Sequence, residues 1–261
     1  MLKQRLLSAL VLIPVVGVLA WLGGWWFTGL MAVAAGLSAW ELLKMLSLDG
    51  HFQPLMLPGI LLAALLVLLP QGEAVQSLLV LAILAGLTGV LFLPRQSAPT
   101  DLLITLGAAL YLGLTLRYLS LLRIREHGLM WLTVTALTVW IMDTGAYFIG
   151  VRFGHHKLWP RISPKKSWEG FWGGLGSATL AAALMAHFWL PGVSAWQGAL
   201  LGVLVGCVGP LGDLSESLFK RQSGVKDSSQ LIPGHGGVLD RVDSFIFVAP
   251  AVYLLTQMLG W

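Results

Sequence analysis

Charged residues and cysteines are scarce in this chain of 261 residues. Lys, Arg, Asp and Glu make up only 11% of it, whereas apolar residues make up 57%. A soluble domain typically carries about 25% charged residues, so this composition indicates a chain that lies in a lipid bilayer. The single cysteine, Cys207, sits inside an apolar run and can form no intrachain disulfide. The chain also lacks a soluble basic domain with exposed aromatic residues, which argues against nucleic-acid binding.

Two common catalytic motifs are missing as well. The sequence contains no G-x-x-x-x-G-K-[ST] loop, which disfavours an ATPase of the P-loop type. It also has no G-x-S-x-G turn, so nothing supports a Ser–His–Asp triad on a nucleophile elbow. Any chemistry must therefore come from other groups of polar residues.

Long apolar runs fill most of the chain. They are continuous rather than alternating, which favours helices over a β-barrel, and each approaches the roughly 20 residues that cross a bilayer. We therefore expect an all-α integral membrane protein, a polytopic bundle of about nine transmembrane helices. The runs are 6–23, 25–46, 54–70, 75–93, 101–121, 129–150, 170–190, 195–214 and 243–260.

Basic residues predict the orientation of this bundle. With nine spans, nearly all of them fall on one side, which the positive-inside rule assigns to the cytoplasm. We expect the N-terminus and the polar motifs to face the cytoplasm from the plasma (inner) membrane of a bacterium, with the C-terminus outside. Arg123 and Arg125 are the exception. The basic residues on the cytoplasmic side are Lys3, Arg5, Lys44, Arg95, five residues from Arg152 to Lys166 and four from Lys220 to Arg241.

Polar residues are distributed unevenly between the two halves of the chain. We expect residues 1–128 to form structural transmembrane helices and residues 129–261 to carry a cytoplasm-facing catalytic site, within one continuous membrane domain. Gly198, Gly202 and Gly206 recur at four-residue spacing, which lets helix backbones approach closely in lipid. The sequence leaves open whether these glycines pack within one chain or at a homodimer contact.

Carboxylates gather near the ends of the last two apolar runs. Asp213 and Ser217 share one helical face, and Asp240 and Asp243 share another. We expect Asp213 and Asp240 to meet at one cation, because carboxylates brought together without one would repel each other strongly. The alternative is that Lys and Arg neutralise them as plain salt bridges.

Three other polar groups are candidates for a site. Asp143 lies inside an apolar run, where an ionisable residue indicates function; the alternative is a hydrogen-bonded polar contact between helices. The segment Lys165-Lys166-Ser167 precedes a predicted helix, and lysines at a helix N-terminus suit a phosphate; the alternative is a basic membrane anchor. The turn from Gly234 to Gly237 permits close approach of the backbone to a ligand, or only a tight turn back into the membrane.

The segment from Ser217 to Asp243 resembles, over 27 consecutive positions, the signature of the phosphatidate cytidylyltransferase (CDP-diacylglycerol synthase) family. It reads Ser-x-Phe-Lys-Arg, Lys-Asp, Pro-x-His-Gly-Gly and Asp-Arg-x-Asp in that order. The resemblance implies three groups of site residues. Catalytic residues would be Asp213, Lys220, Arg221, Lys226, Asp240, Arg241 and Asp243; nucleotide or lipid contacts would come from Asp143, Lys165, Lys166, Ser167, Ser217, Asp227, His235, Gly236 and Gly237; metal ligands would be Asp213, Asp240 and Asp243.

The resemblance also implies a reaction. CTP and phosphatidic acid would give CDP-diacylglycerol and pyrophosphate with Mg²⁺, with a second cation as an open alternative. The expected partners are CTP, phosphatidic acid and membrane lipids, with no nucleic acid. A CTP-dependent lipid kinase and an ion-coupled transporter are the rival hypotheses; a CDP-alcohol phosphotransferase is disfavoured because no D-G-x₂-A-R pattern occurs.

Overall fold

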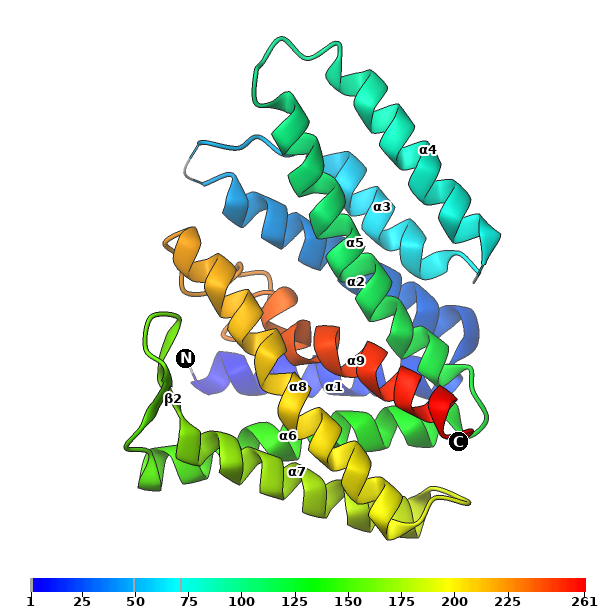
Figure 1. Cartoon of the computed structure of the whole chain (residues 1–261), viewed down its shortest axis with the longest axis vertical. Helices are drawn as coiled ribbons and strands as arrows, with labels where there is room; N and C mark the ends of the chain where they lie inside the picture. Colours follow the sequence, from blue (N-terminus) through cyan, green and yellow to red (C-terminus); the bar gives the residue numbers. More distant parts are fainter. Residues whose placement is uncertain (1, 49, 71) are drawn as a thin grey trace. The chain divides into compact units, whose positions relative to one another are not determined.

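The computed structural model describes residues 2–48, 50–70 and 72–261, with side chains from Ser8 onward. Over these residues the chain forms nine helices and one two-stranded hairpin (Figure 1). The side chains of Lys3 and Arg5, which contributed to the predicted orientation, lie outside the described residues. The elements are α1 (Leu2–Leu22), α2 (Gly24–Leu46), α3 (Met56–Leu68), α4 (Glu73–Val90), α5 (Ala98–Arg123), α6 (Gly128–Phe153), β1 (Lys157–Trp159), β2 (Ser163–Ser167), α7 (Trp168–Trp189), α8 (Ala195–Gln222) and α9 (Leu239–Met258).

The helices follow the apolar runs of the sequence to within a few residues at most ends. Among the described helices, α2, α4, α5, α6 and α8 are long and apolar enough to cross a membrane. The prediction of a helical membrane protein is thereby confirmed, whereas the count of nine spans stays a prediction. Large apolar side chains such as Leu10, Trp25 and Phe92 are exposed, as expected for a surface that faces lipid rather than water.

The chain divides into two compact units whose boundaries differ from those of the predicted halves. The first unit contains Met1–Ser120 and Phe219–Arg241, and the second contains Leu121–Leu218 and Val242–Trp261. Most of the signature segment therefore packs with the N-terminal helices. The assignment of structural and catalytic roles to the two halves stays a prediction.

Glycines bring the helices of the first unit close together. A Cβ on Gly113 of α5 would lie 2.7 Å from the carbonyl oxygen of Ala63 in α3, so only glycine permits this approach. Arg117, also on α5, is buried and donates a hydrogen bond of 2.9 Å to the carbonyl oxygen of Leu66 near the end of α3. In contrast, α4 buries no residue and lies at the periphery of this unit (Figure 1).

The second unit is built on α6 and α7, which run side by side (Figure 1). The glycine series of α8 packs against α7: a Cβ on Gly202 would lie 2.5 Å from the carbonyl oxygen of Ala178, and one on Gly206 would lie 2.6 Å from Leu175. These glycines therefore serve packing within the chain. The basic Arg125, an exception to the predicted orientation, donates to the carbonyl oxygen of Trp261 and lies over the ring of Tyr253.

The antiparallel hairpin β1–β2 was not predicted from the sequence. It joins α6 to α7, with Lys157 opposite Ser167 and Trp159 opposite Ser163. Its cations Lys157, Arg161 and Lys165 are exposed. Side-chain alternation is short and largely polar here, so no strand pattern stands out from the surrounding basic loop.

Candidate active site

Asp240 occupies the first turn of α9 and organises residues 223–238 between α8 and α9, the signature loop, in the first unit. Its Oδ1 atom lies 2.8 Å from Lys220 Nζ at the end of α8. Its Oδ2 atom accepts hydrogen bonds from the backbone N–H of Ser228 (2.9 Å), the hydroxyl of Ser228 (2.7 Å) and the backbone N–H of Gly237 (2.8 Å). One carboxylate thus joins the end of α8, the loop and the start of α9.

The charge of Asp240 is stabilised by these donors. Burial raises the pKa of the carboxyl, but the hydrogen bonds from Lys220, Gly237 and Ser228 outweigh burial and hold its pKa at about 2, below the ordinary value of 3.8. Asp240 is therefore ionised at any physiological pH. Its salt bridge with Lys220 agrees with the alternative of neutralisation by Lys and Arg, while binding of a cation by Asp240 stays a prediction.

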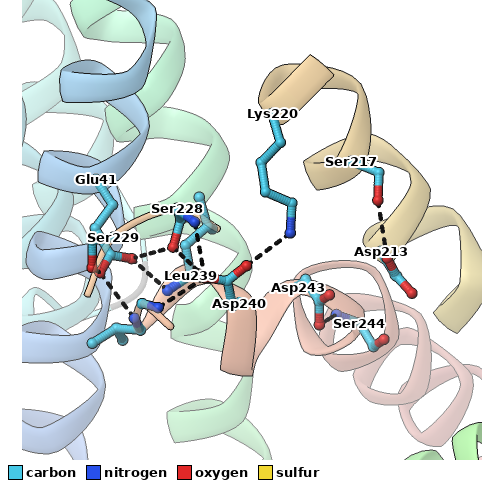
Figure 2. A network of polar contacts seen from close by, with 12 residues as sticks. Glu41, Asp213, Ser217, Lys220, Ser228, Ser229, Leu239, Asp240, Asp243 and Ser244 are labelled. Carbon is cyan, nitrogen blue, oxygen red and sulfur yellow. Dashed lines mark hydrogen bonds and ion pairs between the residues drawn. The ribbon is translucent and has the colours of Figure 1, made fainter. Parts of the chain in front are cut away.

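Glu41 of α2 is a second buried carboxylate in this unit, and its side chain is inaccessible to solvent. Oε1 accepts from the hydroxyl of Ser229 (2.6 Å) and the backbone N–H of Val238 (3.0 Å). Oε2 accepts from the hydroxyl of Ser228 (3.1 Å) and the backbone N–H of Leu239 (2.7 Å). Figure 2 shows Glu41 pointing from α2 into the signature loop. An N-terminal helix therefore contacts the segment that carries the family signature.

The two glycines after His235 allow this packing. Gly236 has a φ of +83°, and a Cβ there would lie 2.7 Å from Asp240 Oδ2. A Cβ on Gly237 would overlap both Ser228 Oγ and Glu41 Oε1. The glycines are thus required by contacts inside the loop, whether or not a ligand also approaches. His235 itself lies 2.7 Å, through Nδ1, from the hydroxyl of Ser8 on α1.

In the second unit, Lys166 and Asp213 form the central ion pair. Lys166 Nζ at the end of β2 lies 2.7 Å from Asp213 Oδ2 on α8. The hydroxyl of Ser217, one turn further along α8, lies 3.3 Å from Asp213 Oδ1 (Figure 2). Asp143 of α6 lies within electrostatic range of both Asp213 and Lys166. Four of the predicted site residues, from three separate elements, are thereby brought together.

Asp243 lies where α8 and α9 touch. A Cβ on Gly212 would overlap the carbonyl oxygen of Asp243, so the two backbones are in direct contact next to Asp213. Asp243 Oδ1 accepts a 2.7 Å hydrogen bond from the backbone N–H of Ser244. Among the described residues, no group of three or more His, Cys, Asp or Glu side chains is arranged to hold a metal ion. The predicted meeting of Asp213 and Asp240 at one cation stays a prediction.

The other predicted site residues divide into exposed charges and a helix cap. Lys165, Arg221, Lys226, Asp227 and Arg241 are exposed. The buried hydroxyl of Ser167, in contrast, accepts a 3.1 Å hydrogen bond from the backbone N–H of Gly170 and caps α7.

Glu169, in the first turn of α7, binds the imidazole of His156 at 2.6 Å. This hydrogen bond, together with backbone N–H donors, lowers the pKa of Glu169 to about 2. The carboxylate is therefore ionised and fixes the hairpin to the start of α7.

Sequence reasoning missed Glu41, Ser228 and Ser229. The signal for Glu41 was present, because it is a carboxylate within the apolar run 25–46, and an ionisable residue in such a run indicates function. The two serines lie inside the signature, but their role depends on a partner from α2, which no spacing within the signature reveals.

Comparisons with known proteins agree on one family. A profile of the cytidylyltransferase family matches residues 3–259. A phosphatidate cytidylyltransferase of Staphylococcus haemolyticus is 36% identical, covering 98% of this chain and all of the relative. One of Bacillus subtilis is 34% identical, covering 98% of each chain. One of Staphylococcus aureus is 49% identical over half of each chain. The family suggested by the signature is confirmed: this chain belongs to the cytidylyltransferase family.

Proposed function

We propose that this chain transfers the cytidylyl group of CTP to phosphatidic acid, giving CDP-diacylglycerol and pyrophosphate in phospholipid biosynthesis. The observation that carries the proposal is the polar network around Asp240, which fixes the signature loop between α8 and α9 and leaves Arg221, Lys226 and Arg241 exposed. The relatives of nearly equal length, named phosphatidate cytidylyltransferases, support the same substrates.

The reaction needs positioning and charge neutralisation more than acid–base chemistry. A phosphate oxygen of phosphatidic acid attacks the α-phosphorus of CTP, and the bond from that phosphorus to the bridging oxygen of the β-phosphate breaks, releasing pyrophosphate. The attacking phosphate is already a nucleophile, so catalysis rests on alignment and on stabilising the charges of the phosphoryl groups. Two anionic substrates approach each other only where cations offset their repulsion.

The structure suggests two different roles for the basic residues of the site. Lys220 and Lys166 each lie in a close ion pair with an aspartate, so they position Asp240 and Asp213. The exposed side chains of Arg221, Lys226 and Arg241 would contact phosphate oxygens, which guanidinium groups suit because they donate two parallel hydrogen bonds. Lys165, exposed on the hairpin, would contact the nucleotide or the lipid head group.

A divalent cation fits the donor chemistry of the second unit. Carboxylate oxygens are the ligands that Mg²⁺ prefers, and Asp213 and Asp243 flank the contact of α8 with α9 at Gly212. These two residues would hold Mg²⁺, which would neutralise charge on the triphosphate when bound. The oxygens of Asp240 already accept from Lys220, Ser228 and Gly237, so this residue would have to exchange a partner to become a ligand. A second cation would bind in addition to the Mg²⁺ ion that Asp213 and Asp243 would hold.

We further propose nine spans, with the site facing the cytoplasm from the inner membrane of a bacterium. α7 and α9 have 22 and 20 residues, which at about 1.5 Å per residue reach roughly 30 Å, the thickness of the hydrocarbon core. α3 has only 13 residues. It is counted as a span because only then does Lys44 share a side with the basic hairpin, as the positive-inside rule requires. A homodimer would need a surface other than the α8 glycines, which pack on α7.

The position of an isotope in CTP tests the proposed reaction. Purified protein in detergent with phosphatidic acid and Mg²⁺ should place label from the α-phosphorus in the lipid and release the γ-phosphorus in pyrophosphate. Label from the γ-phosphorus in the lipid, with CDP released, would instead identify a lipid kinase. Absence of turnover in folded protein would contradict both and favour transport.

A further inference from the structure

We propose that Glu41 is a positioning residue for this reaction. It acts from an N-terminal helix, and it holds both ends of the signature loop in the geometry that turnover requires. The inference rests on the proposed function, because it assigns Glu41 to the same cytidylyl transfer. It places part of the active machinery in α2, outside the segment that carries the family signature.

The partners of Glu41 come from both ends of one loop. Ser228 and Ser229 begin the segment, and Val238 and Leu239 end it at the N-terminus of α9. Each carboxylate oxygen accepts one hydrogen bond from a hydroxyl and one from a backbone N–H (Figure 2). A single side chain thereby closes the loop that presents His235, and it also satisfies two of the N–H groups that the start of α9 leaves without helical partners.

Glu41 is connected to Asp240 through one hydroxyl. Ser228 Oγ lies 2.7 Å from Asp240 Oδ2 and 3.1 Å from Glu41 Oε2. A hydroxyl carries a single proton, so at any moment it donates to only one of the two carboxylates. A change at Glu41 is therefore felt at Asp240, and through Asp240 at Lys220.

Burial separates this role from direct catalysis. The side chain of Glu41 is 0% exposed and its four contacts are all with the protein. It therefore cannot touch a substrate without leaving these donors. A buried carboxylate is tolerated only where charge-assisted hydrogen bonds replace water, and here all of those donors belong to the signature loop and the start of α9.

The test is Glu41→Gln, measured by kcat and by KM for CTP in purified protein. The amide keeps the size of the side chain but places an NH₂ group against a hydroxyl and a backbone N–H that both act as donors. The two hydrogen bonds accepted by one of the carboxylate oxygens are therefore lost. Misplacement of about 1 Å in a catalytic element costs up to roughly 100-fold in rate. We expect kcat to fall roughly 10- to 100-fold, with an increased KM for CTP, in protein that remains folded.

Asp101 offers a matched control in the same unit. It is also 0% exposed, accepts a 2.8 Å hydrogen bond from the backbone N–H of Gln53 and pairs with Arg95, so these partners lie outside the signature loop. Asp101→Asn should lower the unfolding temperature and leave kcat and KM of the folded protein unchanged. A Glu41→Gln variant with the kinetics of Asp101→Asn would show a merely structural role and overturn the inference.

Ser229→Ala decides the question if Glu41→Gln does not fold. It removes the 2.6 Å hydrogen bond that the hydroxyl donates to Glu41 Oε1 and the one that the hydroxyl accepts from the backbone N–H of Leu231. We expect a drop in kcat of roughly tenfold, and wild-type kcat would overturn the inference. Failure of the wild-type protein to form CDP-lipid is a different result, because it would contradict the proposed function itself.

Discussion

Gly237→Ala is the substitution that the structure predicts most sharply. The new methyl group would overlap Ser228 Oγ and Glu41 Oε1. Hydrogen bonds hold both side chains in place, so neither can move away without losing a partner. Ser228 Oγ is bound to Asp240, while Glu41 Oε1 is bound to Ser229 and Val238. The backbone of Gly237 does not have a positive φ, so the conflict is steric alone.

The magnitude follows from the bonds that must break. A hydrogen bond to a charged group contributes roughly 1.5–3 kcal/mol, so the loss of even two of these three bonds costs roughly 3–6 kcal/mol locally. This exceeds the roughly 1–3 kcal/mol of ordinary overpacking in a core. The loop should therefore leave its native position, with cytidylyl transfer reduced at least tenfold.

The assay is incorporation of label from the α-phosphorus of CTP into lipid, combined with thermal unfolding followed by tryptophan fluorescence. Gly107→Ala on α5 is the matched control, because a Cβ there meets nothing within 4 Å. It should leave activity unchanged, and alanine should stabilise the helix by roughly 0.5–1 kcal/mol. Wild-type activity and stability in Gly237→Ala would refute the described packing of Glu41 against the loop.

Three further predictions address stability and the carboxylates. Because the pKa of Asp240 is held at about 2, below its ordinary 3.8, the folded protein binds fewer protons than the unfolded chain, and up to roughly 2 kcal/mol of stability should be lost as the pH falls from 4 to 2. Unfolding in detergent with EDTA should show this loss, and Asp240→Asn should remove it. Gly202→Leu should destabilise the protein by roughly 1–3 kcal/mol or more, because a Cβ already lies 2.5 Å from the carbonyl oxygen of Ala178; an unchanged unfolding temperature would contradict the α7–α8 contact. Asp213→Asn should lower kcat at least 100-fold at saturating Mg²⁺ while Lys157→Met, on the exposed hairpin, changes it less than threefold; equal effects would argue against a special role of Asp213.

The helices were predictable because the bilayer demands long apolar segments, which composition alone reveals. α6 was predicted as 129–150 and found as Gly128–Phe153, and α8 as 195–214 and found as Ala195–Gln222. The C-terminal extension of α8 contains Lys220 and Arg221. Because the prediction followed apolar runs, these charged residues fell outside the predicted helix. The hairpin at 157–167 escaped prediction because its strands have only three and five residues and lie within a basic segment.

The candidate site was predictable in its members but not in their partners. Lys166 and Asp213 were both expected in the site, yet nothing in their spacing of 47 positions shows that they pair. Likewise, Asp240 and Lys220 were both expected in the site, yet their spacing of 20 positions does not show that they form an ion pair. Glu41 lies 187 positions before Ser228, so its role follows from tertiary packing alone.

Amide hydrogen exchange of the purified protein with and without CTP and Mg²⁺ tests most directly where the substrate binds. The account predicts slower exchange in residues 220–240, where Arg221, Lys226 and the loop held by Glu41 lie, and in the hairpin around Lys165. α4, which buries no residue, should be unaffected. Protection confined to segments outside the signature and the hairpin, at a CTP concentration that supports turnover, would contradict the central claim that these charges hold the nucleotide.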